Sequence, residues 1–344
     1  MSRGFLLGKF LPPHAGHRFL CETALGLVDE LAVLVCSLAS DPIPGEERAN
    51  WMVTIVPKAR ILRLESPIPQ YPEEHPEFWT IWPQAVRELH PDPIDRVFAS
   101  EIYVFALAEA LGAEPVLVDP EREAFPVCGS RILADPAAHW RFIPPAVRGW
   151  FQKRVCLLGP ESVGKSTLAA ALADRFGTIA MPEYGRAYDV HYKQAHHAQG
   201  DQWSAGDLLA LARTHAAMRA ALAPSAGPLV IEDTDAIQTA VWAEYLIGTA
   251  PAELEALAAS AAADFYLLLA PDIEWIADGA RYAGDPRTRR RFFESARSRL
   301  EALGLPYKIV AGGDWEGRKA AAIRFVVERF GDLRPDAAPA QSSR

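Results

Sequence analysis

The chain of 344 residues contains little cysteine and no long apolar run. Its four cysteines, Cys21, Cys36, Cys128 and Cys156, are scattered and form no C-x-x-C pair, which argues against a disulfide framework or a thiolate zinc site. No apolar run approaches about 18 residues, so we expect no membrane span. The N-terminus lacks a secretory pattern, because Lys9 interrupts a short apolar stretch. These absences predict a cytoplasmic protein.

Positive charge is also in deficit. Lysine and arginine number 35 against 44 aspartates and glutamates, which gives a formal net charge of −9. Clustered positive charge supplies most of the attraction to nucleic acid and to anionic membranes. The balance therefore predicts neither partner. It favours small-molecule ligands, and a second copy of the chain is a further candidate partner.

The length predicts roughly two domains at about 150 residues each, and the pattern of strands and helices repeats accordingly. Apolar runs alternate with amphipathic stretches, which is typical of parallel strands with helical crossovers. We expect domains at 1–150 and 151–333, a tight Pro-containing connection at 142–151, and a disordered Pro/Ala-rich tail at 334–344. Strands are expected at 5–8, 31–38, 59–64, 96–99, 115–118, 154–159, 228–233, 264–270 and 307–310, and helices at 17–28, 47–56, 77–89, 103–112, 167–177, 208–223, 236–248, 286–304 and 317–330.

The motif GPESVGKST follows a predicted strand and opens a predicted helix. It fits the phosphate loop G-x-x-x-x-G-K-[ST], whose glycines let backbone N–H groups curl around a phosphate of ATP. A lysine then adds charge near the β- and γ-phosphates, and a hydroxyl is offered to Mg²⁺. The expected ATP-binding residues are Gly159, Glu161, Ser162, Val163, Gly164, Lys165, Ser166 and Thr167, with Ser166 also a metal ligand.

Acidic residues follow this loop at the ends of later strands. Asp233 ends the apolar run PLVIED and is expected to hold Mg²⁺. Asp235 fits either substrate binding or the N-cap of the next helix. Glu183 could accept a proton from a substrate hydroxyl, with Arg186 beside it, although a surface pair at a helix start remains an alternative.

Arginines and aromatic residues add candidate ligand contacts. Arg281 and Arg287 precede a long helix and are expected to contact the transferring phosphoryl group, whereas the other arginines of 281–291 fit a solvated face. Tyr184, Tyr188 and Trp242 could stack on a cationic ring. Core packing is an equal alternative for Trp242.

A second cluster lies near the N-terminus in GKFLPPHAGH. Its two histidines, His14 and His17, stand at the entry to a helix, where imidazole and backbone donors suit a departing polyphosphate. Gly8, Lys9 and Phe10 precede them at a strand end and are expected to contact ATP. Two histidines alone do not define a metal site.

Together these segments resemble bifunctional NadR-type proteins, which combine nicotinamide mononucleotide adenylyltransferase with ribosylnicotinamide kinase. The segments that carry the resemblance are GKFLPPHAGH, IPGEERANW, FASEIY, LVDPEREAFPVCGSRI, the junction RFIPPAVRGWFQKRVCLLGPESVGKSTLA, PEYGRAY, IEDTDAIQTAVWAEYLIG and DIEWIADGAR. The resemblance implies an α/β fold with two parallel-sheet domains. The first would be a Rossmann-like nucleotidyltransferase and the second a P-loop kinase, without the helix-turn-helix domain of some family members.

The implied reactions make NAD from nicotinamide riboside. The kinase would pass the γ-phosphoryl of ATP to the riboside, and the first domain would join the resulting mononucleotide to a second ATP with release of pyrophosphate. One departure concerns the family signature I/V-S-x-T/S-x-I-R, in which Cys128 replaces the serine and Leu133 the arginine, while Ser130 keeps the middle hydroxyl. We expect a weakened adenylyltransferase unless Arg131 or Lys9 supplies the missing charge.

Two alternatives stay open at this stage. The kinase could act on another nucleoside or vitamin, because the loop and fold alone allow that. The first domain could instead bind NAD or ATP without turnover and act as a nucleotide sensor, which the leucine at 133 favours.

Overall fold

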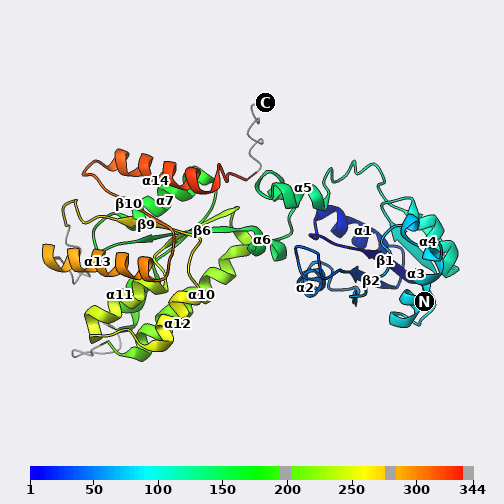
Figure 1. Ribbon diagram of the computed structural model, residues 1–344, viewed down its shortest axis with the longest axis horizontal. Coiled ribbons are helices and arrows are strands. Elements are labelled where there is room, and N and C mark those ends of the chain that lie inside the picture. Colours follow the sequence, from blue (N-terminus) through cyan, green and yellow to red (C-terminus); the bar gives the residue numbers. More distant parts are fainter. Residues whose placement is uncertain (194–202, 276–283, 336–344) are drawn as a thin grey trace. The chain divides into compact units, whose positions relative to one another are not determined.

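The computed structural model describes residues 1–193, 203–275 and 284–335, and these form two units, Met1–Arg148 and Gly149–Arg344 (Figure 1). Each unit contains one five-stranded sheet whose paired strands all run parallel. The expected α/β class with two parallel-sheet domains is therefore confirmed. No helix within the described residues is both long and apolar enough to cross a membrane.

The first unit has the strand order β3-β2-β1-β4-β5. Chain order reverses at β1, because β2 pairs on one side of it and β4 on the other. In such sheets ligands bind beyond the carboxyl ends of the strands at this reversal. The elements are β1 (Arg3–Gly8), α1 (Ala15–Leu25), β2 (Glu30–Cys36), α2 (Gly45–Ile55), β3 (Arg60–Leu64), η1 (Pro72–Glu74), α3 (Phe78–Leu89), β4 (Arg96–Ala99), α4 (Tyr103–Leu111), β5 (Glu114–Leu117), α5 (Gly129–Ala134), η2 (Ala137–Phe142) and α6 (Pro145–Phe151).

The second unit has the strand order β10-β9-β6-β8-β7, with β6 at the centre. Its central strands are buried on both faces, which explains why they are continuous apolar runs in the sequence. The elements are β6 (Lys153–Leu158), α7 (Lys165–Phe176), β7 (Ala180–Met181), α8 (Tyr184–Tyr188), η3 (Asp189–Lys193), α10 (Ala205–Leu222), η4 (Ala223–Ser225), β8 (Leu229–Asp233), α11 (Ala236–Ile247), α12 (Ala252–Ser260), β9 (Phe265–Leu269), α13 (Pro286–Ala302), β10 (Tyr307–Val310) and α14 (Trp315–Phe330).

Most of the segment 142–151, which was expected to be a tight connection, is the short helix α6. Pro145 is the first residue of that helix, where its fixed φ and missing N–H are tolerated. The short helices α5, α8 and α12 were also not predicted as elements. Residues 336–344, which include most of the expected tail, lie outside the described part of the chain.

Candidate active sites

The phosphate loop joins β6 to α7 in the second unit. Three of its residues have positive φ: Gly159 at 143°, Ser162 at 60° and Gly164 at 83°. A Cβ at Gly159 would come within 2.8 Å of the Leu269 carbonyl oxygen, so glycine is required there for both space and backbone conformation. The Nζ of Lys165 donates to two carbonyls of the loop, at 3.1 and 2.9 Å. The loop thus has the compact curl that an anion cradle needs.

Arg318, on α14, holds this loop from behind and is almost fully buried. Its Nη1 donates to the carbonyl of Val163 at 3.2 Å, and its Nη2 donates to the carbonyl of Ala270 at 2.9 Å. Its Nε donates to the Gly312 carbonyl at 2.5 Å, and the guanidinium pairs with Asp272. One side chain therefore fixes the phosphate loop against the ends of β9 and β10.

We expect Arg318→Met to lower the free energy of unfolding of the second unit by about 3 kcal/mol, because three carbonyls and a carboxylate lose their donor. The KM for ATP should rise in parallel, since the loop loses its support. Denaturant unfolding and ATP kinetics measure the two effects. Lys319→Met is the matched control, because its exposed side chain forms only a surface pair with Glu316. Equal stability of both variants would contradict the prediction.

Beside the loop lies a cavity of about 300 Å³. Its walls come from the phosphate loop, α8, α10 and α11, so residues far apart in the sequence share one site. The expected site residues in its wall are Glu161, Ser162, Val163, Gly164, Lys165, Ser166, Thr167, Glu183, Tyr184, Arg186, Asp235 and Trp242.

Glu183 lies near the loop lysine and near a second carboxylate, Asp233, which is not itself in the cavity wall. Burial raises the pKa of Glu183, and the nearby Asp233 raises it further, while Lys165 opposes the shift. Asp233 ends β8 and is buried, and its Oδ1 has no hydrogen-bond partner among the described residues. A buried oxygen left without a donor suits a cation. In the described ranges no three His, Cys, Asp or Glu side chains are grouped so that they could hold a metal ion, so a metal here would need further ligands such as the phosphates or Ser166.

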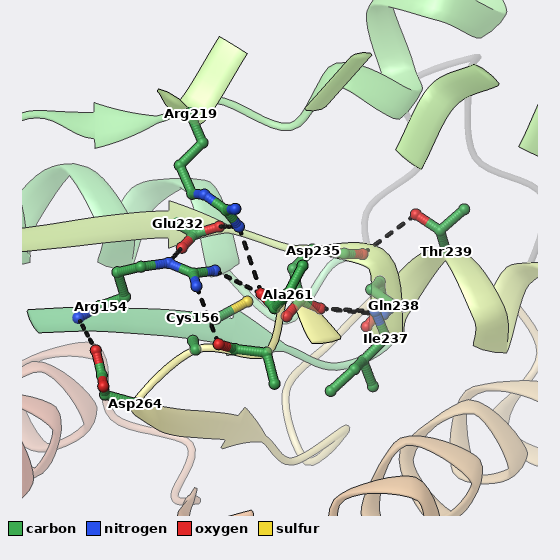
Figure 2. A network of polar contacts seen from close by, with 12 residues as sticks. Arg154, Cys156, Arg219, Glu232, Asp235, Ile237, Gln238, Thr239, Ala261 and Asp264 are labelled. Carbon is green, nitrogen blue, oxygen red and sulfur yellow. Dashed lines mark hydrogen bonds and ion pairs between the residues drawn. The ribbon is translucent and has the colours of Figure 1, made fainter. Parts of the chain in front are cut away.

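Asp235 confirms the N-cap interpretation, since its Oδ1 accepts from the backbone N–H groups of Ile237 and Gln238 at the start of α11 (Figure 2). Its Oδ2 accepts from the Tyr266 hydroxyl at 2.7 Å. Burial and the neighbouring Glu232 raise the pKa of Asp235 to about 6. The side chain also faces the cavity, so capping does not remove it from the site.

A buried ion-pair network lies behind this wall and was not predicted (Figure 2). Glu232, fully buried on β8, accepts from Arg154 Nε at 2.5 Å and lies 3.8 Å from Arg219 Nη1. The arginines also donate to the carbonyls of Ala261 and Ala262. These contacts join β6, β8, α10 and the end of α12.

The cavity also contains polar residues that the sequence analysis missed. Gln238 accepts the Gly159 N–H at 3.1 Å and so ties α11 to the phosphate loop. His215, on α10, lies in the wall and is buried. Thr239 lies one position beyond Gln238 on α11 and also faces the cavity. Each stands within an amphipathic helix, where a lone polar residue gives no sequence signal of its own.

Other expected contacts lie elsewhere. Tyr188 is not in the cavity wall: its hydroxyl donates to Asp207 at 3.0 Å and its ring packs near Trp203. Arg287 is exposed in the first turn of α13 and is likewise not in the wall. Arg281 lies outside the described residues.

The first unit has its own cavity, of about 640 Å³, at the carboxyl end of β1. It collects residues from the β1–α1 loop, α3, the start of α4 and the segment before α5. The expected residues in its wall are Gly8, Lys9, Phe10, His14, His17 and Ser130, joined by Cys128 and Leu133.

The two histidines stack on each other with ring centroids 3.7 Å apart. The backbone N–H of His14 donates to His17 Nδ1 at 3.3 Å. Burial, with the nearby charge of Arg122, lowers the pKa of His14 to about 4 and lowers the pKa of His17 well below its usual value. Both rings are therefore neutral near pH 7, and each carries one N–H donor.

This burial predicts a pH-dependent stability of the first unit. Below the ordinary histidine pKa of 6.5 the unfolded chain binds a proton that the folded His14 refuses until about pH 4. Stability should therefore fall as pH drops from 6.5 to 4, by about 3 kcal/mol for His14 alone. Native-state amide exchange of β1 and β2 in the full chain measures it. A double His14→Gln, His17→Gln variant should have a much shallower slope, with a remainder from the buried His90, whose pKa burial also lowers. An unchanged slope would refute the assignment.

In the cavity wall the arginine is Arg122 and not Arg131. Arg131 is exposed on α5 and absent from the cavity wall, and Leu133 faces the cavity without any polar atom. Arg122 lies in the wall, where its charge acts on both histidines, and its Nη2 donates to Glu101 at 3.1 Å. Arg122 has positive φ in an irregular loop, and the sequence analysis did not select it.

The backbone of Lys9 is held by a buried arginine that the sequence analysis did not select. Arg48, fully buried on α2, donates to the carbonyl of Lys9 and to that of Cys36 at 3.1 Å. It also pairs with Asp41 at 2.7 Å. The strand ends that carry the histidine motif are thereby fixed.

Comparison with known proteins gives similarity along the whole chain. An AAA domain family matches residues 154–318. The trifunctional NAD biosynthesis/regulator protein NadR of Salmonella typhimurium is 29% identical, with 96% of this chain and 83% of that protein aligned. A nicotinamide-nucleotide adenylyltransferase of Methanoculleus marisnigri is 29% identical over 43% of this chain and 88% of its own length.

Two solved structures have the same fold. A NadR protein in complex with NR superposes with a TM-score of 0.76 at 23% identity and covers 96% of each chain. A NadR protein in complex with NAD and AMP-PNP gives a TM-score of 0.75 at 21% identity, over 100% of this chain and 98% of the other. The resemblance expected from the motifs is confirmed by these matches.

Proposed function

We propose that this chain, a NadR-type protein along nearly its whole length, makes NAD from nicotinamide riboside by two successive transfers from ATP. The observation that carries the proposal is the presence, in one chain, of a phosphate loop facing buried carboxylates and a paired-histidine cavity at the end of β1. Similarity to NadR over 96% of the chain supports both halves together.

In the second unit the 5′-hydroxyl of nicotinamide riboside attacks the γ-phosphorus of ATP. A new O–P bond forms, the bond to the β,γ-bridging oxygen breaks, and ADP leaves. Glu183 accepts the hydroxyl proton, since burial raises the pKa of this carboxylate and makes it a stronger base. Lys165 and the loop N–H groups hold the phosphates in line, so positioning and charge supply most of the rate.

Ser166 and Asp233 would hold Mg²⁺ in this site. The buried, unpartnered Oδ1 of Asp233 fits a cation, and the hydroxyl of Ser166 lies in the loop beside Lys165. When bound with ATP, the ion neutralises charge on the phosphate oxygens.

In the first unit the phosphate of nicotinamide mononucleotide attacks the α-phosphorus of a second ATP. The bond to pyrophosphate breaks as the new phosphoanhydride forms, and no base is needed because the nucleophile is already an anion. The neutral rings of His14 and His17 donate hydrogen bonds to the phosphates, with charge from Arg122 and Lys9. Leu133 leaves this charge smaller than the family signature provides, so we expect slow turnover.

Two separate assays test the proposal. Purified protein with ATP and nicotinamide riboside should form the mononucleotide and ADP, and with ATP and the mononucleotide it should form NAD and pyrophosphate. Phosphorylation of other nucleosides without any of nicotinamide riboside would contradict the kinase assignment. Tight NAD binding with no adenylyl transfer would instead support a sensor role for the first unit, which Leu133 favours.

Two carboxylate variants separate the proton acceptor from the metal ligand. Glu183→Gln should lower kcat of the kinase by about 10²-fold or more at every Mg²⁺ concentration, since it removes the base. Asp233→Asn should lose activity that is partly recovered at high Mg²⁺, because it weakens ion binding. Titration of kcat against Mg²⁺ measures both. If the responses are reversed, the roles of the two residues are exchanged.

A cytoplasmic site of action is part of the same proposal. ATP and the nicotinamide nucleotides are charged molecules that do not enter hydrocarbon readily. An enzyme that consumes two ATP molecules per NAD would act where ATP is supplied.

A further inference from the structure

The acceptor cavity of the second unit has a polar end and an apolar end. Along α11 the residues that face it are Asp235, Gln238, Thr239, Trp242 and Leu246, in that order. The polar members stand at the start of the helix, where Gln238 also bonds to the phosphate loop. The apolar members lie about one and two turns further on.

On α10 the order along the chain is reversed: the apolar residues that line the cavity come first and the polar one comes last. Leu208, Leu211 and His215 face the cavity at helical spacing. Arg219, one turn beyond His215, reaches Glu232 on β8. His215 therefore lies about 6 Å along the helix from a contact with the strand that ends in Asp233.

His215 is buried, with a residue exposure of 5%. Its Nε2 is shielded from solvent and has no hydrogen-bond partner among the described residues. Burial lowers its pKa, so the ring is neutral near pH 7 and offers one donor and one acceptor. A buried polar group in this condition requires an explanation, and a ligand in the adjoining cavity provides one.

On the proposed function, the two stripes would orient the acceptor. Its reacting hydroxyl must lie near Glu183 and Lys165, at the polar end of the cavity. Its flat ring then extends toward Trp242 and Leu246 at the apolar end. The sugar between them is the part within reach of α10.

We propose that His215 is a specificity-determining residue that hydrogen-bonds a ribose hydroxyl, 2′ or 3′, of the nucleoside acceptor. This inference rests on the proposed kinase function, and it explains how the kinase site would select ribosides over deoxyribosides. A site built to pair with a hydroxyl rejects the analogue that lacks it, because its own polar group is then left unsatisfied.

The test compares nicotinamide riboside with its 2′-deoxy and 3′-deoxy analogues in the full-length protein. Wild-type kcat/KM should favour the riboside over at least one analogue by about ten-fold. In His215→Phe that preference should fall to about unity, since no group remains to read the hydroxyl. His215→Gln, whose amide reaches about as far as Nε2, should keep part of it. Arg213→Ala is the matched control, because this residue is exposed on the same helix.

The ratio of two substrates is a readout that a merely structural role would not move. A preference that stays at the wild-type value for both analogues in His215→Phe and His215→Gln would overturn the inference, as would a wild type that does not discriminate. If the wild type ignores nicotinamide riboside but phosphorylates another nucleoside, the proposed function fails. The same ratio for that nucleoside and its deoxy analogues then decides the role of His215.

Discussion

Lys165→Ala should lower kcat of the kinase by about 10³-fold and leave adenylyl transfer unchanged. The lysine stands at the first position of α7. In the proposed reaction its ammonium would contact the phosphates and offset the charge that develops as the γ-phosphoryl moves. Its removal leaves the loop N–H groups in place, so ATP should still bind with reduced affinity. Separate measurement of ADP and of NAD formation checks the two halves.

Lys153→Ala is the control for this variant. Lys153 begins β6 and is exposed at the opposite end of that strand from the phosphate loop. It should retain both activities. A Lys165→Ala protein with nearly normal phosphorylation would remove the phosphate loop from the mechanism, and a parallel loss of NAD formation would show that the two activities are not independent.

Arg122→Ala should lower adenylyl transfer by about 10²-fold or more with no change in phosphorylation of nicotinamide riboside. Position 133 is a leucine, so Arg122 and Lys9 supply the positive charge in the part of this cavity wall that the structure describes. Loss of the guanidinium also removes the charge that disfavours protonation of both histidines, so their pKa values should rise. NMR titration of the imidazoles measures this second effect.

Arg131→Ala is the matched control, since Arg131 is nine residues away in the same segment but exposed. The family signature would assign the phosphate contact to a residue near 131 or 133, whereas the cavity wall assigns it to Arg122. The pair of variants therefore tests which of the two assignments is right. If Arg131→Ala is the more damaging change, the role given to Arg122 is wrong.

Much of the fold could be predicted because its strands and helices have strong local patterns. The buried parallel strands, such as Leu229–Asp233, are short apolar runs, and the phosphate loop has a fixed spacing of glycine and lysine. The short helices were missed because few residues set their pattern. At α6 the two prolines were interpreted as part of a tight connection and no helix was predicted, although Pro145 begins one.

The sites were predicted less completely, because cavities are assembled by packing that a linear motif does not encode. Glu183, Asp235 and Trp242 had recognisable neighbours in the sequence, and all face the cavity. His215 had none, and Arg122 lies in a segment that resembles the family but was not singled out there. The former is one polar residue in a helix, and the latter lies in an irregular loop, so only the folded chain brings each to a ligand site.

The hydrogen bond from Gly159 to Gln238 connects α11, which lines the acceptor cavity, directly to the loop proposed to bind the phosphates of ATP. Any change in α11 that reshapes the acceptor side also disturbs the donor side. Helix α10 carries no such tie in the described residues. Diversification toward new acceptors, whether in evolution or in the laboratory, should therefore start from α10.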